Sequence, residues 1–224
     1  MSSIILFPIL AIYALIGQSQ AMCSGEAVYQ VIFNNMLTPQ TFGSKIPETG
    51  LNFSPLAAVS HSNRQSFLTV RGFASPQVEQ IAETGMNGRF LALAENLKGA
   101  EQGVRDVAGG MGAGPGMNQT VELTVNCENP FITALSMIAP SPDWIVQVNN
   151  MNTLDMNGEF RQRLGGNLIA YDAGTDDGGD FTAASDASFD MPSEPQKNIA
   201  PLFEDETDPF DGRMVGTYVF VRIM

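Results

Sequence analysis

The chain has 224 residues, and its 24 aspartates and glutamates outnumber its 11 lysines and arginines, which gives a formal charge of −13. Hydrophobic residues make up 44%, too many for a disordered acidic protein, and the length suits one ordinary domain. The shortage of basic residues argues against a nucleic-acid partner, because phosphate binding needs a basic face. It also disfavours anionic membranes, unless a divalent cation forms a bridge. Histidine is the usual general base near neutral pH, and the chain has only one. The composition therefore favours a binding module over an enzyme.

The first 21 residues are expected to be a cleaved secretory signal peptide. They contain no Asp, Glu, Lys, Arg or His, and an apolar run spans residues 4–16. Ser19 and Ala21 supply the small residues that a signal peptidase recognises. A membrane anchor is the alternative, but the run is shorter than the roughly 20 residues that a bilayer requires, and Pro8 interrupts it. We therefore expect residues 22–224 to form a secreted, extracellular protein.

The first part of the mature chain contains few clear strand signals. Residues 27–33 are β-branched and aromatic, which predicts a largely buried strand. Residues 34–56 contain several prolines and glycines and are expected to be a loop. A short strand is predicted over residues 66–71.

Two helices are predicted next. Ser75 and Pro76 are typical of a helix N-cap and first helical residue, and Gly85 is placed to end that helix. A second helix is predicted over residues 90–107, where apolar residues follow a helical stripe and Glu101 and Arg105 lie one turn apart.

The rest of the chain has the pattern of an antiparallel β protein. Short apolar segments alternate with Gly, Pro, Asn and Asp, which predicts strands over residues 120–126, 131–138, 144–148, 167–171 and 215–223. The predicted fold class is therefore all-β, an antiparallel β-sandwich with a short helical insertion between the early and later strands.

Secretion changes what Cys23 and Cys127 imply. Two cysteines and no others in an oxidising compartment predict one disulfide. The alternative is a buried free Cys127 and a disordered Cys23. Asn52 and Asn118 begin possible glycosylation tripeptides, of which the first is the poorer because Pro55 follows it directly.

Two acidic turns carry the most specific pattern in the chain. Asp172 and Asp176 flank Ala-Gly-Thr directly after a predicted strand, so a curled loop can bring both carboxylates towards one point. Hard cations such as Ca²⁺ bind carboxylate and carbonyl oxygens in loops of this kind, although the spacing is not that of an EF-hand. The alternative is a solvated acidic turn.

These turns resemble those of a known family. Pro-Ser-Pro-Asp-Trp ending at Trp144, followed some thirty residues later by Asp-Ala-Gly-Thr-Asp, is similar to the spondin N-terminal domain of F-spondin and M-spondin (mindin). Further agreements, in the same order as in the family, are Phe-Ser-Pro-Leu at 53–56, Ser-His at 60–61 and Ala-Glu-Thr-Gly at 82–85. The resemblance extends from about Ala27 to the last strand.

The resemblance implies an antiparallel β-sandwich with a calcium site at one end. Carried over residue by residue, it assigns Asp143, Asp172 and Asp176 as ligands of Ca²⁺. It also implies a glutamate on the strand before the first motif, which Glu122 fits best and for which Glu128 is the substitute.

The sequence thus predicts a secreted, calcium-binding adhesion or extracellular-matrix module that binds a protein receptor or a glycan. One rival is a hydrolase that uses Asp143 with Asp172 or Asp176 as a carboxylate pair. However, the chain has one Trp and four Tyr, and no aromatic cluster is available to shape a substrate. Another rival is calcium-bridged docking to anionic lipid. His61 is expected to be a core or turn residue rather than a catalytic base, because no Ser or Cys is placed for it to activate.

Overall fold

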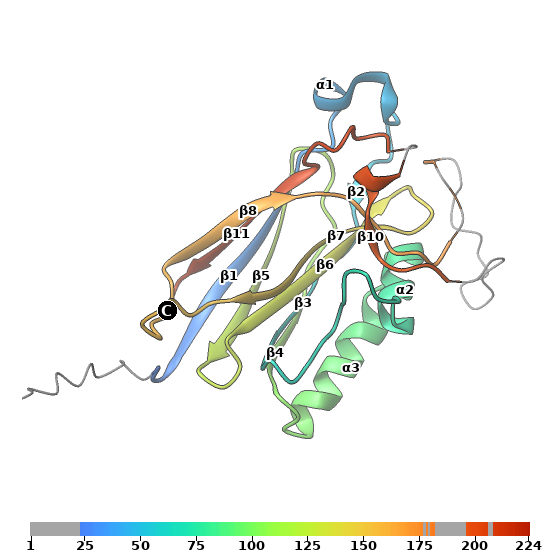
Figure 1. Cartoon of the computed structure of the whole chain (residues 1–224). Coiled ribbons are helices and arrows are strands. Elements are labelled where there is room, and N and C mark those ends of the chain that lie inside the picture. Colours follow the sequence, from blue (N-terminus) through green and yellow to red (C-terminus); the bar gives the residue numbers. More distant parts are fainter. Residues whose placement is uncertain (1–22, 177, 179, 182–195, 206–207) are drawn as a thin grey trace, which may run out of the picture.

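The computed structural model in Figure 1 describes residues 23–176, 178, 180–181, 196–205 and 208–224. The predicted signal peptide lies outside these residues. The strands are β1 (Glu26–Asn35), β2 (Asn52–Phe53), β3 (Ala57–His61), β4 (Val104–Gly109), β5 (Asn118–Asn126), β6 (Phe131–Ala139), β7 (Trp144–Asn152), β8 (Arg163–Leu168), β9 (Tyr171–Asp172), β10 (Ala200–Pro201) and β11 (Gly216–Arg222).

Within the described residues the strands form two antiparallel sheets. The smaller sheet has the order β5-β1-β11-β8. The larger has the order β10-β9-β7-β6-β3-β4, and β2 pairs with β6 beside it. Figure 1 shows the two sheets stacked as a sandwich, which confirms the predicted fold class.

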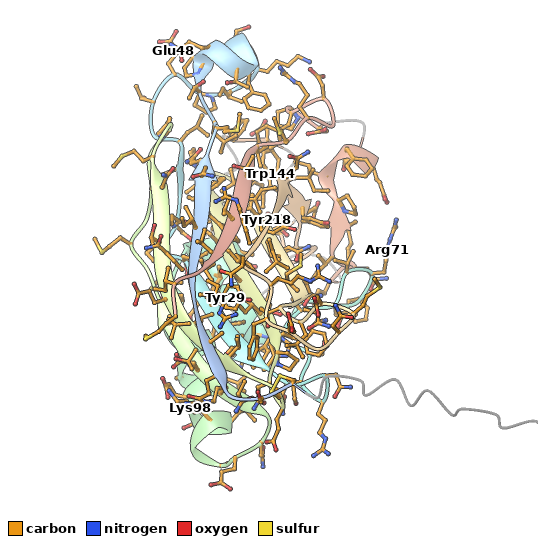
Figure 2. All side chains as sticks on the ribbon, turned by 90° about the vertical axis from the view of Figure 1, so that its left-hand side faces the viewer. Tyr29, Glu48, Arg71, Lys98, Trp144 and Tyr218 are labelled. Carbon is orange, nitrogen blue, oxygen red and sulfur yellow. A yellow bond between two sulfur atoms is a disulfide. The ribbon has the colours of Figure 1, made fainter. Side chains whose placement is uncertain are left out.

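The main core fills the space between the sheets. Tyr29, Val31 and Phe33 of β1 face Trp144 and other apolar residues of the larger sheet, and each of these four side chains is at most 1% exposed. Alternation along a strand sends every second side chain inward, and burial along β1 follows that period. Figure 2 shows Tyr29 and Trp144 inside the sandwich.

Two of the helices, those of the insertion after β3, cover the outer face of the larger sheet (Figure 1). The helices are α1 (Pro39–Phe42), α2 (Pro76–Thr84) and α3 (Gly88–Gly99), with short 3₁₀ helices at Gly43–Lys45 and Leu202–Glu204. Ile81 of α2 and Phe90 of α3 pack with Val59 of β3 in a second buried cluster. The helical insertion therefore lies between β3 and β4, as predicted (Figure 1). Among the described residues, no helix has the length and apolar character needed to cross a bilayer.

The caps of α2 agree with the prediction. Ser75 Oγ accepts a hydrogen bond from Val78 N, and Gly85 ends the helix in the left-handed conformation with φ of 70°. A side chain at Gly85 would also place its Cβ 2.8 Å from Ser54 Cβ, so the close approach of the helix end to this segment requires glycine.

The predicted second helix is too long. It ends at Gly99, and residues 104–109 form β4, which pairs with β3. Glu101 and Gly103 adopt φ values of 56° and 73°, which end the helix and turn the chain. Arg105 consequently forms an ion pair with Glu26 at 2.8 Å, not with Glu101.

Other boundaries also differ from the prediction. Residues 66–71 form no strand; they are a loop that buries Phe67 and Leu68 in the cluster beneath the helices. The predicted loop at residues 34–56 contains α1 and β2, and the sequence pattern does not predict β3 directly after it. The strand predicted at 167–171 corresponds to the end of β8 and the start of β9.

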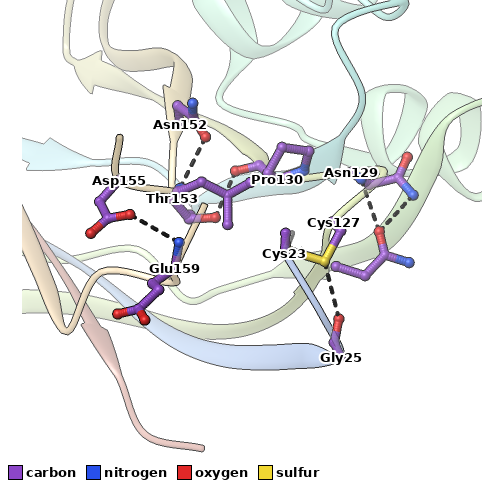
Figure 3. Close-up of a disulfide and its surroundings, with 11 residues drawn as sticks. Cys23, Gly25, Cys127, Asn129, Pro130, Asn152, Thr153, Asp155 and Glu159 are labelled. Atoms are coloured by element: carbon purple, nitrogen blue, oxygen red, sulfur yellow. Dashed lines mark hydrogen bonds between the residues drawn. A yellow bond between two sulfur atoms is a disulfide. The ribbon is translucent and has the colours of Figure 1, made fainter. Parts of the chain in front are cut away.

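Cys23 and Cys127 form a disulfide with their Cα atoms 5.6 Å apart (Figure 3). It joins the residues just before β1 and just after β5. These strands are already paired there, with Glu26 opposite Asn126. The structure therefore confirms the predicted disulfide, which closes one end of the smaller sheet.

Candidate metal centre

The first acidic turn connects β6 to β7 and ends at Asp143. Ser141 Oγ accepts a hydrogen bond from Trp144 N at 3.0 Å, which fixes this turn against the start of β7. The indole of Trp144 then packs edge-on against Phe181 and Phe210 in the core. Anchoring on both sides holds Asp143 inside the end of the sandwich, where its side chain is 0% exposed.

The second acidic turn approaches through the pairing of β9 with β7. Asp172 lies directly opposite Trp144 in this ladder, next to Asp143. Asp172 Oδ1 accepts a hydrogen bond from Gly174 N at 2.6 Å, which curls the chain back. Gly174 has φ of 71°, and a Cβ there would lie 2.4 Å from the carbonyl oxygen of Lys197. This turn therefore needs glycine.

Hydrogen bonds to Asp143 tie the two turns together. Its Oδ2 accepts from Thr175 N at 2.7 Å, from Thr175 Oγ1 at 3.3 Å and from Asp176 N at 3.2 Å. Its backbone carbonyl accepts from Ala173 N. By contrast, Oδ1 of Asp143 is buried and has no hydrogen-bond partner among the described residues. A buried acceptor without a partner is costly, so this oxygen is expected to bind a proton or a cation.

Electrostatics supports the same conclusion. Burial, with a smaller contribution from the nearby charge of Asp172, raises the pKa of Asp143 to about 7, and the Thr175 and Asp176 amides oppose this rise. Burial likewise raises the pKa of Asp172, whereas Gly174 N–H, Lys197 and a hydrogen bond with Asp143 lower it. Two adjacent carboxylates in a buried site either share a proton or bind a cation between them.

Asp176 contributes to the site mainly through its backbone. Its amide holds Asp143, while its own Oδ1 accepts from Gly178 N at 2.8 Å. Among the described residues, no three His, Cys, Asp or Glu side chains converge closely enough to hold a metal ion. The structure therefore brings together the carboxylates of Asp143 and Asp172, with Asp176 adjacent through its backbone.

The structure does not bring Glu122 to this pair. Glu122 lies in β5 of the smaller sheet, opposite Gln30 of β1, and is exposed. Its neighbours Val121 and Leu123 face the core, so alternation directs Glu122 to the outer surface. The substitute Glu128 precedes β6, whereas Asp143 follows it. Nine residues of strand, about 30 Å at 3.3 Å per residue, separate those two ends.

Sequence reasoning missed a cation and an acid beside the pair. Lys197 N donates to Gly174 O at 2.7 Å, and the charge of Lys197 lowers the pKa of Asp172. The charge of Asp205 raises the pKa of Asp172. Asp172, Lys197 and Asp205 line a cavity of about 320 Å³. Both residues arrive from the segment around β10, and the β9–β10 pairing is the long-range contact that places them.

The similarity to known proteins extends over both aspartate turns. A family model described as Spondin_N matches residues 27–213, which include Asp143, Asp172 and Asp176. Spondin-2 of Homo sapiens is 27% identical over 175 residues, which cover 76% of this chain and 53% of that relative. Spondin-1 of Gallus gallus is 25% identical over 185 residues, which cover 80% of this chain and 22% of that relative.

This chain thus spans about half the length of Spondin-2 and about a fifth of Spondin-1. Spondin-2 of Rattus norvegicus gives the same proportion, with 25% identity over 176 residues and 53% of its length covered. Because the family model covers most of the sandwich and both acidic turns, the chain belongs to the spondin N-terminal domain family.

Proposed function

We propose that this protein is a secreted, calcium-binding adhesion or extracellular-matrix module that acts by binding a protein receptor or a glycan. Two findings support the adhesive part: membership of the spondin N-terminal domain family and the similarity to Spondin-1 and Spondin-2. The disulfide agrees with an extracellular location.

The buried Oδ1 of Asp143 is the observation that supports the calcium part most directly. It has no hydrogen-bond partner among the described residues and lies in a turn next to the carboxylate of Asp172. Calcium binds oxygen ligands, and both groups supply them. We therefore propose Asp143 and Asp172 as the carboxylate ligands, with the Asp176 backbone holding Asp143 in place.

A calcium ion needs six to eight oxygens, so two carboxylates do not complete its shell. In this proposal, backbone carbonyls and water supply the other oxygens. The ion would neutralise the repulsion between the two aspartates and tie the end of β6 to the end of β9. Because it would bind the native state only, it would stabilise the fold.

Neither rival function has an observation in its favour. A hydrolase would need its paired carboxylates in contact with substrate, but the side chain of Asp143 is 0% exposed. Calcium-bridged lipid docking would place the ion at an open surface, whereas the unpartnered oxygen of Asp143 is buried.

The test is thermal and chemical unfolding of the full chain in EDTA, calcium and magnesium. At a free calcium concentration one hundred times Kd, the free energy of unfolding should rise by about 2.7 kcal/mol. Magnesium should have a smaller effect, because it demands a tighter octahedral shell. Asp172→Asn should reduce the calcium effect without unfolding the protein in EDTA.

Asp155→Asn is a matched control. Asp155 also accepts backbone N–H groups in a turn, from Asn157 and Glu159, but it lies beyond the far end of β7. Calcium should stabilise the Asp155→Asn variant as much as it stabilises the wild type. If calcium leaves the wild-type midpoint unchanged, the calcium part of the proposal is wrong.

A further inference from the structure

The outer face of the smaller sheet points away from the rest of the molecule. The inner face of this sheet fills the core, and α2 and α3 pack on the far side of the sandwich, against the larger sheet. Figure 2 looks onto the outer face, with β1 and β11 running through the middle of the view. Alternate residues of β5, β1, β11 and β8 point outward there, and their side chains are partly or fully exposed.

The centre of this outer face is apolar. Its two middle strands contribute Val28, Ile32, Val219 and Val221, which are each partly exposed, and Ile223 follows with an exposed fraction of 48%. These side chains adjoin one another, because Ile32 pairs with Val219 and Ile223 N donates to Val28 O. The outward positions of a sandwich are ordinarily polar, so an apolar stripe over two neighbouring strands indicates a surface that packs against a partner.

Two charges of opposite sign flank the apolar stripe. Glu122 lies on the edge strand β5 and Arg163 on the opposite edge strand β8, and both are exposed. Neither side chain forms an ion pair or hydrogen bond with any described residue. The other outward charge of the four strands, Glu26, pairs with Arg105 at 2.8 Å. The outer face is therefore electrically balanced on a chain whose formal charge is −13.

The strand registers place the two unpaired charges in one row. Glu122 pairs with Gln30, Gln30 pairs with Val221, and Val221 pairs with Arg163. The row crosses all four strands, so the backbones of Glu122 and Arg163 are about 14 Å apart at 4.8 Å per strand. The two charges lie at equal distances on either side of the boundary between β1 and β11.

We propose that this outer face binds the same face of a second copy of the chain, in a dimer whose two-fold axis runs along the strands between β1 and β11. Rotation about that axis sets β5 of one copy over β8 of the other and keeps each residue in its row. Glu122 then faces Arg163 of the second copy. Because a two-fold interface uses each contact twice, the dimer contains two such ion pairs.

The neighbouring row agrees with this arrangement. Thr120, Ile32, Val219 and Gly165 follow one another across the four strands. The same rotation sets Ile32 against Val219 of the second copy, so the apolar stripes meet. It also sets Thr120 over Gly165, which has no side chain to obstruct the approach. Stacked sheets commonly pack with their strands aligned within about 30°, as this axis requires.

The position of the charges favours a second copy as the occupant. Opposite charges placed symmetrically about the middle of a sheet match themselves under this rotation. An axis across the strands would instead set β5 over β5, and Glu122 would meet no arginine. The balanced charge of the face also matters, because two chains of charge −13 repel one another through their other surfaces.

The size of the face predicts a weak dimer. Four strands at 4.8 Å spacing cover about 19 Å, and strands of 6 to 10 residues extend about 26 Å on average. Two copies therefore bury about 1,000 Å² in total, which is the lower limit for a specific interface. We expect a reversible equilibrium with a Kd on the order of 10–100 μM. The inference goes beyond the proposed function and does not rest on the calcium site.

The experiment is sedimentation velocity of the purified full chain from about 5 to 500 μM, a range that brackets the expected Kd. It is run in EDTA and in calcium, and the Kd should be the same. Arg163→Glu and Glu122→Arg each set like charges against one another, and each should weaken the dimer at least about tenfold. The double variant Glu122→Arg/Arg163→Glu exchanges the charges and should restore most of the lost affinity.

Arg64→Glu is the matched control. Arg64 is an exposed arginine in the segment after β3, outside the smaller sheet, and its reversal changes the net charge as Arg163→Glu does. This variant should dimerise like the wild type, and every variant should keep the wild-type melting midpoint, because all three positions are exposed. A wild type that stays monomeric over the whole range would overturn the inference. Single reversals without effect, a double variant no better than the singles, or an equal loss in Arg64→Glu would overturn it as well.

Discussion

Asp143 and Asp172 interact directly because the β7–β9 ladder pairs Asp172 with Trp144, the residue that follows Asp143. The charge of Asp172 raises the pKa of Asp143, and a hydrogen bond between the two side chains opposes the rise in the pKa of Asp172. In the absence of a cation, a proton shared between the two carboxylates would relieve this repulsion. A cation and this proton compete for the same oxygens.

Asp143→Asn tests this description. An asparagine carbonyl can accept from the Thr175 and Asp176 amides, and its NH₂ group can donate to Asp172 as the shared proton does. We expect the variant to unfold in EDTA within about 1 kcal/mol of the wild type and to show no stabilisation by calcium. Asp143→Ala leaves the buried Thr175 amide and the partly buried Asp176 amide without this acceptor and should cost about 1–3 kcal/mol. Urea unfolding with and without calcium measures both. A calcium response retained by Asp143→Asn would contradict the proposed role of this carboxylate.

Gly174→Ala should destabilise the turn that carries Asp172. Gly174 has φ of 71°, and an added Cβ would lie 2.4 Å from the carbonyl oxygen of Lys197. Gly116 is a matched control, with φ of 73° and nothing within 4 Å of an added Cβ. Gly116→Ala should cost only the left-handed strain of about 1–2 kcal/mol. Gly174→Ala should cost clearly more, because Lys197 must also move. Equal losses in urea unfolding would show that the contact with Lys197 is unimportant.

The fold class could be predicted because most strands carry period-two patterns bounded by turns. β3 is not predictable in this way because all five of its residues are buried, so no alternation is visible. Ala58 faces the other sheet, while Ala57 and Val59 face the helices. The sequence pattern wrongly places β4 in a helix because the apolar residues of β4 continue the helical stripe of α3. The chain reverses between the two elements through the backbone conformations of Glu101 and Gly103, which the apolar pattern does not reveal.

The candidate site could be predicted only in part, for a related reason. Asp143 and Asp172 lie in local motifs next to strands, and a strand pairing brings them together. Lys197 could not be found in this way, since its contact with Gly174 joins segments that share no local pattern. The outward orientation of Glu122 could have been predicted from the alternation of side chains along the strand. Val121, Leu123 and Val125 face the core, so Glu122 faces outward.

Loss of the disulfide should destabilise the protein strongly. The bond closes a loop with a sequence separation of 104 residues, for which the chain-entropy model gives about 4–5 kcal/mol. We expect a loss of about 2–5 kcal/mol when Cys23 and Cys127 are both replaced by serine, and a similar loss on reduction of the wild type. Urea unfolding measures the loss, and mass spectrometry of a non-reduced digest confirms the pairing. A stability unchanged by reduction would show that β1–β5 pairing alone holds this end.

His61 is a buried titratable group that does not belong to the aspartate site. It is 0% exposed, with Nδ1 2.9 Å from the carbonyl oxygen of Ser62 and Nε2 2.9 Å from Thr133 Oγ1. A carbonyl oxygen only accepts, so Nδ1 carries the proton in the neutral ring and Nε2 accepts from Thr133. Burial is the main cause that lowers the pKa of His61 below its ordinary value, against the Ser62 hydrogen bond.

A lowered pKa makes the unfolded state take up a proton at a higher pH than the native state. The contribution of His61 to stability is therefore complete above about pH 6.5 and is lost as the pH falls below that value. The pKa of Asp143 is raised, so its effect on stability has the opposite dependence on pH. Its contribution to stability is lost as the pH rises through about 7. Since Asp143 is present in both proteins, a comparison of the wild type with His61→Gln isolates the histidine. Urea unfolding in EDTA between about pH 7 and 5 should show a steeper acid loss of stability in the wild type than in His61→Gln. Parallel curves would mean that His61 titrates alike in the native and unfolded states, contrary to its burial.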